Sequence, residues 1–174
     1  MVQGQISVAD NDGVYVIKLE GDVRLTLSIS FDEFIENMFA KKQFFSVLFD
    51  LTGAKAIDST TLGLMAKISI GMQQREWDQP IVVTDNPSML KLLSSMGFDD
   101  IFQIVSPSEV DVVLDKPYAL EERTDELGVT KRVLEAHRTL MQLNESNSET
   151  FKELVEGLEG EEQGRLSALA HKYY

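Results

Sequence analysis

Four consecutive polar residues, Asp58-Ser59-Thr60-Thr61, form the part of the sequence best suited to chemistry. They come shortly after the apolar run 44–51 and precede apolar residues at helical spacing. Ser59 is therefore predicted to stand at a helix N-terminus, where unpaired N–H groups and the helix dipole favour negative charge. A phosphate on this hydroxyl would be stabilised there. The same residues also fit a simpler role, because Asp or Ser before a helix is an ordinary N-cap.

Residues that other reactions would need are scarce. The chain has no cysteine, which excludes disulfides, Cys-ligated zinc and thiol catalysis. Its two histidines, His137 and His171, lie far along the chain in charged sequence, so we expect neither beside Ser59. A serine hydrolase is disfavoured for the same reason, and because a Gly-x-Ser-x-Gly elbow is absent. We expect no enzymatic activity, no cofactor and no metal.

Asp50 raises a second alternative, because it lies at the end of an apolar run, like the phosphoacceptor of a response-regulator receiver domain. Such a domain needs an acidic pair after its first strand to bind magnesium. It also needs a lysine after the strand predicted near 101–105. The sequence there continues Ser106-Pro107-Ser108, without a lysine, so the receiver interpretation is disfavoured.

The charge of the chain limits its partners. Its 174 residues carry 29 acidic and 16 basic side chains, for a net charge of −13. Nucleic acid and anionic membranes attract basic surfaces, so neither is an expected partner. The first ten residues do not resemble a signal peptide, and no apolar run approaches the roughly 20 residues of a membrane span. A cytoplasmic protein that binds other proteins is predicted.

Strand and helix patterns alternate over residues 3–115. The run 44–51 is apolar at both alternations, which indicates a strand covered on both faces. The alternation predicts an α/β fold in which helices flank a mixed sheet. The expected elements are strands at 3–9, 14–20, 44–51, 81–84 and 101–105 and helices at 29–40 and after Ser59, Asn86 and Ser106.

Residues 117–174 differ in kind from a first domain at 1–116, because charge dominates and aromatic residues become fewer. We expect a helical extension: one amphipathic helix or a helix pair broken near Gly128, a further helix that stops at Gly160, and a weak final helix beyond it. Three roles stay open: packing on the domain, self-association into a homodimer, and binding of a second partner. Apolar residues seven apart mark the first helix of the extension: Leu120, Leu127, Leu134 and Met141.

In this order, the motifs resemble the STAS domain of bacterial anti-sigma factor antagonists, over roughly residues 3–115. Two positions depart from the family pattern: Thr61 replaces a common Gly or Ala, and Gly21-Asp22-Val23 varies a Gly-Glu-Leu-Asp turn. The extension is similar to that of HsbA-type antagonists. The matching segments are Val47-Leu48-Phe49-Asp50-Leu51, Asp58-Ser59-Thr60-Thr61-Leu62-Gly63, Ile81-Val82-Val83-Thr84, Met96-Gly97-Phe98 and Ile101-Phe102-Gln103-Ile104-Val105.

The resemblance implies that a serine kinase, acting also as anti-sigma factor or switch protein, phosphorylates Ser59. It also implies a PP2C-type phosphatase that removes the phosphate. An added charge of about −1.5 to −2 would weaken partner docking. The alternative is a scaffold that is not phosphorylated and acts through its C-terminal helices. The expected partner-binding residues are Asp58, Thr60, Thr61, Leu62 and Gly63, with Asp22 at the border of the same surface.

Overall fold

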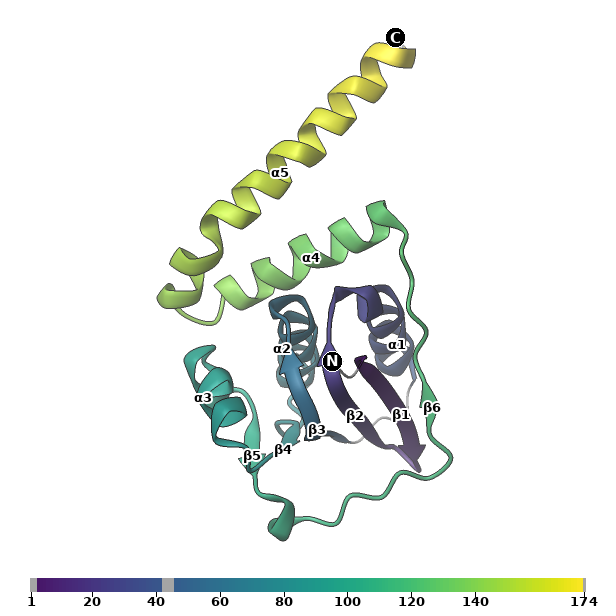
Figure 1. The fold of residues 1–174 in the computed structure, drawn as a ribbon, viewed down its shortest axis with the longest axis vertical. Coiled ribbons are helices and arrows are strands. Elements are labelled where there is room, and N and C mark those ends of the chain that lie inside the picture. Colours follow the sequence, from purple (N-terminus) through teal and green to yellow (C-terminus); the bar gives the residue numbers. More distant parts are fainter. Residues whose placement is uncertain (1–2, 42–45, 174) are drawn as a thin grey trace.

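The computed structural model describes residues 3–41 and 46–173, with side chains described up to residue 164. Within this part, a mixed sheet has the strand order β5-β4-β3-β2-β1-β6 (Figure 1). The strands from β2 to β5 are parallel, whereas β1 is antiparallel to both β2 and β6. The strands are β1 Gln5–Asn11, β2 Val14–Val23, β3 Ser46–Ile57, β4 Ile81–Val83, β5 Gln103–Val105 and β6 Tyr118–Ala119.

The two C-terminal helices differ in how they lie on the molecule. In Figure 1, α4 lies across the ends of α1 and α2, while α5 extends away from the rest of the molecule. The predicted α/β architecture with a helical C-terminal part is thereby confirmed. The helices are α1 Ser28–Ala40, α2 Ser59–Gln74, α3 Pro87–Ser95, α4 Glu126–Met141 and α5 Glu145–Tyr173.

Both faces of the central strands are covered by apolar side chains. Successive side chains of a strand point to opposite faces, and on β3 both Leu48 and Phe49 are buried. Phe49 belongs to the main core, together with residues of the helices. Leu48 packs on the other face with the segment 110–114. The prediction that β3 is covered on both faces is confirmed, while Phe44 and Phe45 of that apolar run lie outside the described residues.

The segment after Ser106 was predicted to be a helix, and this was wrong. It holds a 3-10 turn at Pro107–Glu109, Val110 after it has an extended backbone, and residues 110–114 form no helix. Its apolar side chains at spacing two, Val110 and Val112, pack against the sheet, whereas Val113 is 61% exposed. Alternate side chains therefore reach the sheet here, as in an extended chain. In a helix, residues two apart would not lie on the same face.

The C-terminal part also differs from its predicted pattern. Residues 118–119 form β6, which pairs with β1 at the edge of the sheet. Helix α5 continues through Gly160, where the sequence predicted a stop. Helix α4 begins at Glu126, with Asp125 as its cap, so Gly128 lies in its first turn. Leu140 and Phe151 of this part join the main core. A domain boundary near residue 116 stays a prediction.

Candidate functional site

The start of α2 places Ser59 at a capped helix N-terminus. Asp58 is the N-cap, and its Oδ1 accepts a hydrogen bond from the backbone N–H of Thr61 at 2.9 Å. The backbone N–H of Asp58 donates to the carbonyl oxygen of Val23 at 3.1 Å, which ties this loop to the end of β2. Because Asp58 satisfies the capping requirement, the hydroxyl of Ser59 is not needed for it.

The Ser59 hydroxyl instead pairs with His137 of α4. Oγ of Ser59 lies 2.7 Å from Nε2 of His137, and Nδ1 of His137 lies 2.6 Å from the carbonyl oxygen of Val133. A carbonyl only accepts, so Nδ1 donates to it. In a neutral imidazole, Nε2 is then the acceptor, and Ser59 donates. The expectation that no histidine lies beside Ser59 was therefore wrong, because α4 brings together residues 78 positions apart.

A serine paired with a histidine invites comparison with a hydrolase, but the surroundings favour a structural pair. The side chain of His137 is 2% exposed, and the ring of Phe151 packs edge-on at 4.9 Å between centroids. The partner of Nδ1 is a main-chain carbonyl instead of a carboxylate. A substrate would need space that these side chains fill, so the geometry favours a contact that holds α4 on α2.

Most of the expected partner-binding residues are buried. Thr60, Thr61 and Leu62 are at most 2% exposed, and Gly63 is also buried. Gly63 meets α4 most closely, since a Cβ at this position would lie only 2.6 Å from the Cβ of Ala136. The absence of a side chain at Gly63 therefore allows α4 to pack directly on the first turns of α2.

The remaining two expected residues lie in a concavity that is open. Asp22 and Asp58 both line this space of about 480 Å³, together with Arg24 and Leu25. Arg24 forms an ion pair with Asp22, with Nη2 and Oδ2 2.7 Å apart, and the hydrogen bond from Arg24 to Asp22 raises the pKa of Arg24. Arg24 and Leu25 could not be predicted as part of the site, because nothing in their local sequence pattern marks them.

The buried carboxylate of Asp32 links the three helices α1, α2 and α4. Asp32 of α1 is 8% exposed at its side chain and accepts from Lys67 Nζ of α2 at 2.7 Å and Arg132 Nε of α4 at 3.1 Å. Burial would lower the pKa of Lys67, but hydrogen bonds to Asp32 and Glu36 outweigh it and raise this pKa. Such a carboxylate depends on its partners, because an unpaired buried charge is costly.

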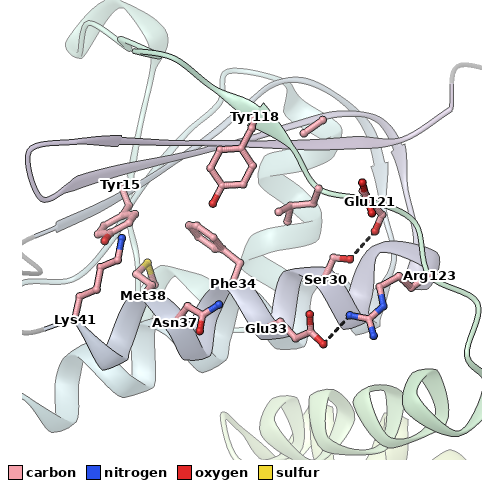
Figure 2. Close-up of a pocket in the computed structure, with 12 residues that line it drawn as sticks. Tyr15, Ser30, Glu33, Phe34, Asn37, Met38, Lys41, Tyr118, Glu121 and Arg123 are labelled. Carbon is pink, nitrogen blue, oxygen red and sulfur yellow. Dashed lines mark hydrogen bonds and ion pairs between the residues drawn. The ribbon is translucent and has the colours of Figure 1, made fainter.

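A second concavity of about 410 Å³ lies between α1 and the chain around β6 (Figure 2). Tyr15 lines it, with the Lys41 ammonium 5.7 Å from the centre of its ring. At the other end, Arg123 forms an ion pair with Glu33 at 2.6 Å. These cations already interact with groups of the same concavity, so they do not mark it as a binding site for an anion.

Asp50 does not form part of a metal site in the structure. It is 6% exposed, and its Oδ1 accepts from the backbone N–H of Thr52 at 3.0 Å and from its hydroxyl at 2.7 Å. Among the side chains that the structure describes, in residues 3–41 and 46–164, no group of three His, Asp or Glu could hold a metal ion. In the same ranges, no helix combines the length and apolar character that a membrane crossing requires.

Comparisons with known proteins concern the first two thirds of the chain. The family model described as "STAS domain" matches residues 5–111. A search of curated proteins found no match. Among solved structures, a protein of Thermotoga maritima, described as a candidate anti-sigma factor antagonist, has 19% identity and a TM-score of 0.50, covering 61% of this chain and 86% of that one.

Two structures of SpoIIAA also match this part of the chain. Unphosphorylated SpoIIAA, an anti-sigma factor antagonist, has 14% identity and a TM-score of 0.49, covering 64% of this chain and 90% of that one. The phosphorylated form from Bacillus has 15% identity and the same TM-score, with coverages of 62% and 95%.

Proposed function

Because the chain belongs to the STAS domain family, we propose that it is an anti-sigma factor antagonist of a bacterial partner-switching pathway. With Ser59 unmodified, it binds an anti-sigma factor or a switch kinase. Phosphorylation of Ser59 releases that partner, and a PP2C-type phosphatase restores binding. The observation that carries the proposal is Ser59 itself, the first residue of α2, with Asp58 already serving as the cap.

The switch rests on two opposite effects of a phosphate on Ser59: it is stabilised by the helix N-terminus but weakens the binding of the partner. The N-terminus of α2 favours a negative charge within the domain itself. A phosphate of about −1.5 to −2 charges would, however, add to the carboxylates of Asp58 and Asp22 at the adjacent open concavity. A partner of this acidic surface is expected to carry complementary charge. It nevertheless loses affinity when Ser59 is phosphorylated, because the phosphate inside the contact must be desolvated when the partner docks.

The partner can first contact the part of the site that is open. Leu25 is 38% exposed there and offers an apolar contact, while Arg24 and Asp22 offer paired polar groups. The proposed protein is cytoplasmic, acts without enzymatic activity and makes no direct contact with nucleic acid or membrane. Its C-terminal part corresponds to the HsbA-type extension. These helices could also form a homodimer, and a measurement of molecular mass in solution distinguishes a dimer from a monomer.

The proposal is tested by affinity capture from a lysate of the native organism with the Ser59→Ala variant, followed by mass spectrometry and direct binding measurements. We expect a kinase-like protein that binds Ser59→Ala and binds Ser59→Asp at least tenfold more weakly, a difference of about 1.4 kcal/mol. Ser88→Asp is the matched control, because Ser88 is exposed near the start of α3. Equal affinities of the two Ser59 variants would favour the scaffold alternative.

A further inference from the structure

We propose that α4 is an intramolecular competitor of the partner: it occupies the surface at the start of α2, and kinase or partner engages Ser59 fully only after α4 has left. The proposed function names what α4 excludes, so the inference rests on it. The movement of α4 itself can nevertheless be measured without any partner.

The first reason is the position of the Ser59 hydroxyl. Its Oγ lies 2.7 Å from Nε2 of His137, a side chain that is 2% exposed and packed against Phe151. A phosphoryl group on Oγ adds three oxygens where the imidazole now lies. Phosphorylated Ser59 and docked α4 are therefore mutually exclusive at this contact.

The second reason is the burial of the neighbouring segment. A kinase has to bind the chain around its target hydroxyl, yet Gly63, one turn after Ser59, is buried against Ala136 of α4. Gly63 and Ala136 approach so closely that a methyl group cannot be added between them. A second protein thus cannot contact this face of α2 while α4 is docked.

The third reason is the free energy needed to displace α4, which any competing partner has to supply. Leu140 of α4 is fully buried in the main core, and Arg132 pairs with the buried Asp32. A partner that binds only the open form has its apparent affinity reduced by the fraction of molecules that are open. Variants that weaken α4 docking should therefore bind the partner more tightly.

The test uses the absence of cysteine from the chain. Ser59→Cys provides a single thiol, and its rate of alkylation by iodoacetamide reports how often α4 leaves. Ala136→Leu adds bulk against Gly63 and forces α4 from α2 without changing the domain surface. Glu135→Leu introduces the same side chain at an adjacent exposed position and is the matched control.

We expect the thiol of Ser59→Cys to react at least tenfold faster when combined with Ala136→Leu than with Glu135→Leu. The thiol of Ser88→Cys, combined in the same way with Ala136→Leu or with Glu135→Leu, should react at the same rate in both variants. A cooperative thermal transition of each variant shows that the domain is folded. If Ala136→Leu does not fold, Arg132→Ala removes the ion pair to Asp32 without adding bulk and should accelerate labelling at position 59 in the same direction. Equal labelling at position 59 in the variant and the control would overturn the inference.

The binding arm separates the inference from the proposed function. The captured partner should bind Ala136→Leu more tightly than Glu135→Leu, by a factor no larger than the increase in labelling. Faster labelling without tighter binding would overturn competition by α4, even if Ser59→Ala and Ser59→Asp still differ. Conversely, equal binding of the two Ser59 variants would count against the proposed function, whereas the labelling result would stand.

Discussion

The starts of α2 and α3 are built alike but differ in what covers them. Each helix follows a strand of the parallel part of the sheet, and each has an acidic or amide cap: Oδ1 of Asp58 accepts from Thr61 N–H, and Oδ1 of Asn86 accepts from Ser88 N–H, both at 2.9 Å. Helix α4 packs over the first turn of α2, whereas Ser88 is exposed. A helix N-terminus suited to phosphate is thus a local property, while its accessibility is a property of the whole fold.

Loosening the covering helix α4 is expected to have the largest effect on stability. Leu140→Ala removes a fully buried side chain of α4 from the main core and should lower the free energy of unfolding by about 2–5 kcal/mol, measured by urea denaturation. Leu90→Ala on α3, where the side chain is 37% exposed, is the control and should change it by under about 1 kcal/mol. Similar effects of the two substitutions would mean that α4 is not part of the folded core.

The caps of α2 and α3 are expected to contribute equally to stability. Asp58→Ala and Asn86→Ala each remove one side-chain acceptor of a helix N-terminus and should each cost about 1 kcal/mol of unfolding free energy. The same urea experiment measures both. A much larger loss for Asp58→Ala would show that this residue also supports the contact between α2 and α4.

A smaller effect is expected from pH at the linkage below α4. The pKa of Lys67 is raised in the folded protein, so the folded state holds this proton more tightly than the unfolded chain does. The resulting stabilisation is complete below the ordinary value of 10.5 and is lost as pH rises through the folded value. Lys67→Met should therefore flatten the fall in unfolding free energy above pH 10.5, whereas Lys91→Met, at an exposed position of α3, should leave its slope unchanged.

The sequence predicted the features that depend on neighbouring residues. The cap before Ser59, supplied by Asp58, and the start of a helix directly after Asn86 are both present. Each is signalled by one or two residue types at fixed offsets. The burial of β3 on both faces was also predictable, because its apolar run shows no alternation.

The pairing of distant segments was not predictable in the same way. The apolar stripe of α4 indicated that one of its faces packs, but not that this face lies on α2. His137 lies in charged sequence, and only the docking of α4 places it 2.7 Å from Ser59. Strand β6 has two residues, which is too short for any periodicity to appear. The role of Asp58 and Ser59 in partner binding stays a prediction.

The proposed switch requires that phosphate on Ser59 releases the partner. Its most direct test is the affinity of the captured partner for the full chain with phosphoserine incorporated genetically at position 59, compared with phosphoserine at position 88. We expect at least a tenfold loss of affinity for phosphoserine at 59 and, for phosphoserine at 88, an affinity equal to that of the unmodified chain. Unchanged binding with phosphoserine at 59, or equal losses at both positions, would contradict it.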